Sequence, residues 1–344
     1  MTAMAQPIPS GQTAILDGLA GLGGQTLEAA DRLLGKAVAA LRAELAPAGR
    51  LDGAALDRAQ HAAHGLAWLA TYVEVIRQMA AYAGRMQAEG RFGEVEALLV
   101  QTGLAEYCSQ IVGGIPMSQL EFIRLHELGV APEDVAAFVE GPAAALIRKG
   151  NSPEARGRLA TLLLQQQGTA TYGDSGLDET LEAMRGEMRR FSEAEVTPHA
   201  HEWHLANAYI PLDIIAKMSE LGVFGLTIPE EYGGLALGKE AMCVVSEELS
   251  RGYIGVGSLG TRSEIAAELI LGGGTAEQKA EWLPKIASGE VLPTAVFTEP
   301  NTGSDLASLK TRAVREGDAY RVTGQKTWIT HPVRADLMLS LIHI

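Results

Sequence analysis

Two short segments in the last third of the chain combine residue types that could bind a flat, polar ligand. The first covers residues 296–305, reads VFTEPNTGSD, and follows an apolar run at 292–297. Pro300 and Gly303 break the backbone there, and such a break exposes successive peptide N–H groups. The hydroxyl groups beside them belong to Thr298, Thr302 and Ser304. Clustered N–H and hydroxyl donors suit an anionic or carbonyl-rich ligand.

The second segment, residues 326–330, reads KTWIT. Its Trp328 offers a large flat face, with the hydroxyls of Thr327 and Thr330 on either side. An aromatic plane flanked by hydroxyls suits a wall against a flat heteroaromatic cofactor. The alternative is a capped turn and a buried tryptophan, which we favour for either segment taken alone.

The elements that must hold these segments are strands. The apolar and alternating runs predict strands at 292–297, 311–315, 319–323, 326–330 and 336–342. The turn around Gly317 joins two of them as a hairpin. Residues 291–344 are therefore expected to begin a β domain that is incomplete at its C-terminal end.

Helices are expected in most of the remaining chain. Apolar residues recur at helical spacing within 25–167, which predicts a helical accessory domain after a mobile N-terminus at 1–24. A small, polar stretch at 168–176 is typical of a linker. A second helical region follows at 177–290. The predicted fold class is α+β.

Two patterns resemble binding motifs but lack the required context. Gly255, Gly257 and Gly260 match a dinucleotide-binding pattern, yet a helix is predicted before them where the motif requires a strand. The histidines His199, His201 and His204 are clustered but lack a matching cysteine or carboxylate spacing. We therefore predict neither a dinucleotide loop nor a metal site.

Composition excludes several classes of protein. The net charge of −14 argues against nucleic-acid binding, and the sequence contains no basic run. No apolar run approaches the ~20 residues of a membrane helix. The two cysteines, Cys108 and Cys243, lie far apart, which fits a reducing compartment, and no basic residue precedes Arg32. We expect a soluble, cytoplasmic protein.

Taken together, the two segments resemble the acyl-CoA dehydrogenase family, in which the TEP-x-x-GSD loop and a WIT strand hold the flavin of FAD. The resemblance extends from about residue 177 to 339, and it implies a helical domain at 177–290 followed by the start of an antiparallel β-barrel domain. It includes IPEEYGG at 228–234, GTAEQK at 274–279 and WLPK at 282–285.

The resemblance implies roles for individual residues. The residues expected to bind FAD are Phe297, Thr298, Gly303, Ser304, Trp328, Ile329 and Thr330. Ser304 would also reach the CoA arm of an acyl-CoA substrate. Arg262 is the one cation expected to face the acyl pocket, with a surface salt bridge as an equal alternative.

The implied reaction is α,β-dehydrogenation of an acyl-CoA thioester, with electrons passed to an electron-transferring flavoprotein. In the family the catalytic base is a glutamate in a C-terminal helical domain. No residue here matches it, so we assign no catalytic residue and expect the chain alone to be inactive. Glu299 and Asp305 look like structural carboxylates of the loop. The complete protein is expected to be a homo-oligomer.

The long N-terminal helical region is absent from ordinary fatty acyl-CoA dehydrogenases and resembles that of family members that act on methylsuccinyl-CoA. This resemblance implies a short, branched acyl-CoA with a second carboxylate as the substrate. Methylsuccinyl-CoA, converted to mesaconyl-CoA, is the best candidate, because Arg262 would pair with that carboxylate. Three alternatives remain. They are another short- or branched-chain acyl-CoA dehydrogenase, a non-catalytic flavoprotein, and a helical interaction module joined to a decayed enzyme.

Overall fold

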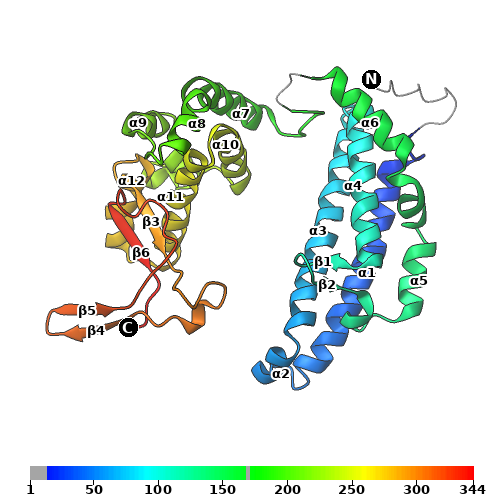
Figure 1. The fold of residues 1–344 in the computed structure, drawn as a ribbon, viewed down its shortest axis with the longest axis horizontal. Helices are drawn as coiled ribbons and strands as arrows, with labels where there is room; N and C mark the ends of the chain where they lie inside the picture. Colours follow the sequence, from blue (N-terminus) through cyan, green and yellow to red (C-terminus); the bar gives the residue numbers. More distant parts are fainter. Residues whose placement is uncertain (1–13, 168–170) are drawn as a thin grey trace. The chain divides into compact units, whose positions relative to one another are not determined.

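A computed structural model describes residues 14–167 and 171–344 and divides the chain into two compact units (Figure 1). The first unit ends at Gly176 and the second covers Leu177–Ile344. Helices make up most of both units, and the longer strands lie in the second. The predicted α+β class is confirmed.

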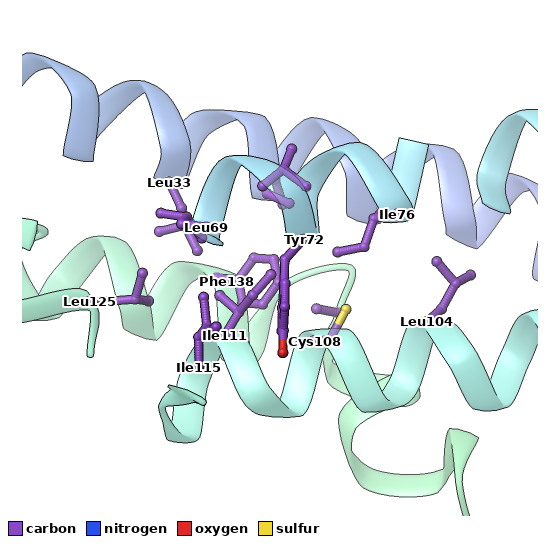
Figure 2. Close-up of a cluster of buried hydrophobic side chains, with 14 of the residues drawn as sticks. Leu33, Leu69, Tyr72, Ile76, Leu104, Cys108, Ile111, Ile115, Leu125 and Phe138 are labelled. Carbon is purple, nitrogen blue, oxygen red and sulfur yellow. The ribbon is translucent and has the colours of Figure 1, made fainter. Parts of the chain in front are cut away.

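Three long helices form the first unit: α1 (Leu19–Leu45), α3 (Gln60–Ala88) and α4 (Glu94–Gly113), with α1 and α3 packed along each other. Leu69, Val73, Ile76 and Ala80 are buried because their spacing places them on one face of α3. Figure 2 shows this core, where side chains of α1, α3 and α4 meet.

Shorter elements cover the ends and one side of this bundle. The helices are α2 (Gly53–Arg58), α5 (Pro132–Glu140) and α6 (Pro153–Gln165), with a 3-10 turn at Leu125–Leu128 and a π-helical turn at Leu146–Gly150. The two-residue strands β1 (Ile115–Pro116) and β2 (Phe122–Ile123) pair antiparallel.

The N-terminal boundary differs from the prediction. Helix α1 begins at Leu19, so residues 19–24 are helical and not part of a mobile segment. Small residues here allow close packing: a Cβ at Gly23 would lie 3.5 Å from the side chains of Ala80 and Leu104. Residues 1–13 of the predicted mobile segment lie outside the described residues.

The predicted linker at 168–176 is docked where the structure describes it, from residue 171 onward. Arg91 forms an ion pair with Asp174 at 2.6 Å, and the Tyr82 hydroxyl donates to the Asp174 carbonyl oxygen at 2.5 Å. This segment is therefore held against the first unit by polar contacts.

The helices of the second unit are α7 (Glu179–Phe191), α8 (Thr197–Leu205), α9 (Leu212–Glu220), α10 (Lys239–Gly252), α11 (Ile254–Gly273) and α12 (Ala276–Ala287). The Glu248 carboxylate is only 1% exposed and accepts from Arg189 and Arg251 at 2.6 and 2.8 Å. Burial alone would raise the pKa of Glu248, but the two guanidinium groups lower it. This ionic group ties α7 to α10.

The glycine pattern at 255–260 belongs to a helix. It lies at the start of α11, directly after α10, and its glycines are packing positions. A Cβ at Gly257 would lie 2.0 Å from the Ser250 hydroxyl oxygen, and one at Gly260 would lie 3.0 Å from Val223. Close helix packing thus accounts for these residues.

The histidine segment lies on α8, where His199 stacks on Trp203 with ring centroids 5.7 Å apart. Across residues 14–167 and 171–344, no three His, Cys, Asp or Glu side chains are grouped so that they could hold a metal ion. No helix in the same ranges is long and apolar enough to cross a bilayer.

Four strands complete the second unit. β3 (Pro293–Val296) pairs parallel with β6 (Leu337–Ser340), and β4 (Arg312–Glu316) pairs antiparallel with β5 (Ala319–Thr323). The described strands form no closed barrel. β6 is shorter than the strand predicted at 336–342, and the predicted strand at 326–330 is absent. Trp328 and His331 have φ angles of 58° and 37°, which are incompatible with a strand.

Candidate functional site

Glu299 organises the loop that follows β3. Its backbone forms a bridge with Thr302, through N–H to carbonyl bonds of 2.9 and 3.1 Å. Its carboxylate accepts from the amides of Lys310 and Thr311 at 2.7 and 2.9 Å and from the Thr311 hydroxyl at 2.5 Å. These hydrogen bonds lower the pKa of Glu299 to about 2, and the bond from the Thr311 hydroxyl contributes most. The residue is structural, as the sequence suggested, and is a poor base at neutral pH.

Lys326 and Thr327 attach the second segment to the first. The Lys326 ammonium lies 3.1 Å from the Glu299 carboxylate and donates to the carbonyl oxygens of Phe297 and Leu341 at 2.8 and 2.9 Å. The Thr327 amide donates to the Thr298 carbonyl oxygen at 3.0 Å. The two segments chosen from the sequence therefore lie side by side.

A low pH should weaken the attachment of residues 326–330 to the loop that contains Glu299. The folded-state pKa of Glu299, about 2, is below its ordinary value of 4.5, so its ionised form stabilises the fold above pH 4.5. That stabilisation is lost as the pH falls from 4.5 through 2. We expect Glu299→Gln to lower the free energy of unfolding of the second unit at pH 7, and the deficit to shrink below pH 4.5. Urea unfolding of the wild-type protein and of Glu299→Gln, at pH 7 and below pH 4.5, measures this difference in the free energy of unfolding.

Asp305→Asn is the matched control, because Asp305 is an exposed carboxylate of the same loop that accepts only from Ser308 within the described chain. It should leave the free energy of unfolding nearly unchanged at both pH values. A Glu299→Gln deficit that stays constant from pH 7 to pH 3 would contradict the assigned ionic role.

The outer face of the joined segments is open. Gly303 and Ser304 are exposed, and their amides donate no hydrogen bond to any described residue. A Cβ added to Gly303 would have no neighbour within 4 Å. Trp328 is 89% exposed, which is unusual for so large an apolar ring. Free donors and an uncovered aromatic plane fit a flat polar ligand.

Ile329 and Thr330 lie deeper than Trp328. Both are half-buried, and the Thr294 hydroxyl on β3 donates to the Thr330 carbonyl oxygen at 2.7 Å. The segment is thus fixed to β3 after Trp328 as well as before it. Trp328 is held in a turn, and not on the predicted strand.

Arg262 lies in the first half of α11, a helix that packs against β3. Its Nε atom is buried and has no hydrogen-bond partner among the described residues. The predicted alternative, a surface salt bridge, is absent from the same part of the chain, where no carboxylate pairs with Arg262.

His331 is the residue near this site that the sequence analysis missed. Its Nε2 atom lies 3.0 Å from the Pro293 carbonyl oxygen, and its Nδ1 atom is buried without a partner among the described residues. Burial lowers the pKa of His331, and the charges of Arg262 and Arg334 lower it further. The only available signal was its position directly after the Trp-Ile-Thr run.

Two models of known domains match the second unit. The N-terminal domain of acyl-CoA dehydrogenase matches residues 178–290, and the middle domain of acyl-CoA dehydrogenase matches residues 294–343. The matches are consecutive, and they cover all the site residues described above. The resemblance noted in the sequence is confirmed.

Similar proteins include (2S)-methylsuccinyl-CoA dehydrogenase from Cereibacter sphaeroides, 56% identical over 95% of this chain and 59% of the relative. Mitochondrial isovaleryl-CoA dehydrogenase from Bos taurus is 35% identical over 53% of this chain and 44% of the relative. A crystal structure of acyl-CoA dehydrogenase from Geobacillus kaustophilus has 38% identity and a TM-score of 0.46, covering 49% of this chain and 44% of that one.

The similarity to the Cereibacter sphaeroides enzyme includes the helical first unit, because it extends over 95% of the chain. The chain spans 59% of that relative's length. Through the two consecutive domains in residues 178–343, the chain belongs to the acyl-CoA dehydrogenase family.

Proposed function

We propose that the complete protein binds FAD and dehydrogenates a short, branched acyl-CoA, with methylsuccinyl-CoA as substrate and mesaconyl-CoA as product. The observation that carries the proposal is the bond of 3.0 Å from the Thr327 amide to the Thr298 carbonyl oxygen. It holds the hydroxyl-rich loop beside Trp328. One joined site thereby offers both polar donors and an aromatic face.

The residues available to FAD share one property: they lie on or directly beside the joined segments. They are Phe297, Thr298, Gly303, Ser304, Trp328, Ile329 and Thr330. Trp328 supplies a face for stacking. The amides of Gly303 and Ser304, which donate to no described residue, supply donors for anionic or carbonyl oxygens. A bound FAD would supply the acceptor for the hydride that leaves the β-carbon of the substrate.

Removal of the α-proton requires a base, and we assign none within this chain. Glu299 is unsuitable because its carboxylate already accepts four contacts and its pKa is lowered to about 2. The other carboxylate of the loop, that of Asp305, is exposed and accepts from the Ser308 hydroxyl at 2.5 Å, and we do not assign it as the base either.

Arg262 supports the choice of a substrate with a second carboxylate. A carboxylate that enters a desolvated pocket needs a cationic partner, and the Arg262 guanidinium has a buried N–H to donate. The methylsuccinyl-CoA dehydrogenase relative, 56% identical, supports the same choice. The isovaleryl-CoA dehydrogenase relative, 35% identical, represents the alternative of an uncharged branched acyl group.

We further propose that the reduced protein passes its electrons to an electron-transferring flavoprotein, and that the complete protein is a cytoplasmic homo-oligomer. The electron acceptor and the oligomer follow from the family resemblance, and the cytoplasmic location follows from the two widely separated cysteines, which fit a reducing compartment. A non-catalytic flavoprotein would bind FAD and show no turnover, and a helical interaction module would bind no flavin.

The test is turnover by the purified complete protein with methylsuccinyl-CoA and isovaleryl-CoA, using a dye as electron acceptor. We expect a flavin absorbance spectrum, formation of mesaconyl-CoA, and a higher kcat/KM for methylsuccinyl-CoA. A protein without flavin would refute the cofactor assignment. A preference for isovaleryl-CoA would refute the substrate assignment while leaving the reaction class intact.

A further inference from the structure

Two arginines and one histidine form a cluster next to β3 in the second unit. Arg262 comes from α11, and His331 and Arg334 come from the segment before β6. Helix α11 packs against β3, and the charges of Arg262 and Arg334 both lower the pKa of His331. His331 is fixed to β3 through the Pro293 carbonyl oxygen at 3.0 Å.

Arg334 already has partners within the second unit. Its guanidinium donates to the Ile210 carbonyl oxygen and lies 4.8 Å from the centroid of the Tyr209 ring. The one carboxylate of the segment, Asp336, accepts from the Leu292 amide at 2.9 Å. β3 and β6 contain no ionisable side chain. Among the described residues, Arg262 and His331 are the members of this cluster whose buried nitrogen atoms lack partners.

The partner of His331 determines where its proton lies. A carbonyl oxygen can only accept, so Nε2 must donate to Pro293, and the neutral ring then carries no proton on Nδ1. Burial and the two arginines lower the pKa of His331, so the ring is neutral at pH 7.5. Nδ1 therefore becomes a donor only when the ring takes up a second proton.

A carboxylate placed between Arg262 and His331 would shift His331 from its neutral form to its protonated form. It would accept from the buried Arg262 N–H, and its negative charge would favour a protonated His331 whose Nδ1–H donates to it. Two buried nitrogen atoms would gain partners at once. An uncharged acyl branch would provide neither bond and would leave the ring neutral.

We propose that Arg262 and His331 together bind the second carboxylate of the acyl group, and that His331 takes up one proton at Nδ1 when this carboxylate binds. The inference rests on the proposed function and makes His331 a specificity-determining residue of the same site. The only bond that forms is Nδ1–H: a neutral ring, a carboxylate and a proton from solvent give an imidazolium–carboxylate pair.

Proton uptake is measured by isothermal titration calorimetry in two buffers of different ionisation enthalpy at pH 7.5. The complete, flavin-loaded protein is first reduced anaerobically, so that methylsuccinyl-CoA binds without turnover. We expect about one proton taken up per methylsuccinyl-CoA and almost none per 2-methylbutyryl-CoA, because only the first presents a carboxylate to the ring. Binding of methylsuccinyl-CoA without proton uptake would overturn the proposal.

His331→Asn is the diagnostic variant, because an amide can donate without taking up a proton. We expect it to abolish proton uptake and to weaken binding of methylsuccinyl-CoA about tenfold, with 2-methylbutyryl-CoA unaffected. Ser340→Ala is the matched control: it removes a hydroxyl that donates to the Val296 carbonyl oxygen at 3.0 Å on the same pair of strands, without changing charge. Equal weakening of both ligands by His331→Asn would show a merely structural role.

The wild-type proton count needs no variant, so the proposal stays testable if His331→Asn fails to fold. The outcomes also separate the two proposals. If wild type prefers 2-methylbutyryl-CoA, the proposed substrate is wrong. If wild type prefers methylsuccinyl-CoA but takes up no proton, only the role of His331 is wrong.

Discussion

Replacing Trp328 with alanine and Thr298 with valine together should remove most of the flavin from the complete protein. Trp328 is 89% exposed, so it contributes little to the core, and its loss should act chiefly on the ligand that covers it. Aromatic stacking and one hydroxyl hydrogen bond together contribute about 2–3 kcal/mol, which corresponds to roughly 30- to 150-fold in affinity. The ratio of flavin absorbance to protein after desalting measures the loss.

Tyr320→Ala combined with Thr323→Val is the matched control. It removes an exposed aromatic ring and a hydroxyl from β5, on the neighbouring hairpin of the same unit. Flavin content should stay at the wild-type level in this variant. Unchanged flavin in the Trp328 and Thr298 double variant would contradict the assignment of the joined segments to FAD.

The elements predictable from sequence are those whose signals are local. The hairpin of β4 and β5 follows from two alternating runs around Gly317, whose φ of 64° suits a glycine. Helix α3 follows from apolar residues at helical spacing. In both cases, neighbouring residues along the chain determine the backbone conformation.

The segment 326–330 was predicted wrongly because long-range contacts determine its conformation. Its threonine, tryptophan and isoleucine residues favour a strand. Lys326 instead reaches Phe297 and Leu341, and Thr327 bonds to Thr298. These partners lie elsewhere in the sequence, and single-segment propensity contains no information about them.

The start of α1 shows that amino-acid composition alone does not predict mobility. Leu19 and the small residues after it were expected to be mobile because they lack charge and contain several glycines. In the structure Leu19 and Gly23 are buried, because small residues allow α1 to approach the other helices. A glycine-rich stretch can therefore indicate close packing as well as mobility.

The candidate site was predictable in its parts but not in its arrangement. The sequence identified Arg262 as a cation that faces the acyl pocket, with a surface salt bridge as an equal alternative. It could not show that α11 brings this residue to the strand that holds His331, because that arrangement depends on α11 packing against β3. The engagement of Asp336, the carboxylate nearest in sequence to Arg334, is likewise a property of the fold, since it accepts from the Leu292 amide.

Changing Arg262 to methionine should abolish the preference of the complete enzyme for methylsuccinyl-CoA over its uncharged analogue 2-methylbutyryl-CoA. Methionine retains a long apolar side chain and removes the charge. A carboxylate that loses its cationic partner in a buried site is destabilised by about 3 kcal/mol, so kcat/KM for methylsuccinyl-CoA should fall roughly 100-fold. With 2-methylbutyryl-CoA, kcat/KM should change little, because that ester has no charge to pair.

Arg334→Met is the matched control, because Arg334 belongs to the same cationic cluster but already donates to Ile210 and contacts the Tyr209 ring. It should retain most of the preference for methylsuccinyl-CoA. If the wild-type enzyme itself favours 2-methylbutyryl-CoA, methylsuccinyl-CoA is not the substrate. The other contrary outcome is that wild type favours methylsuccinyl-CoA while Arg262→Met keeps that preference. In that case the second carboxylate of the substrate does not bind to Arg262.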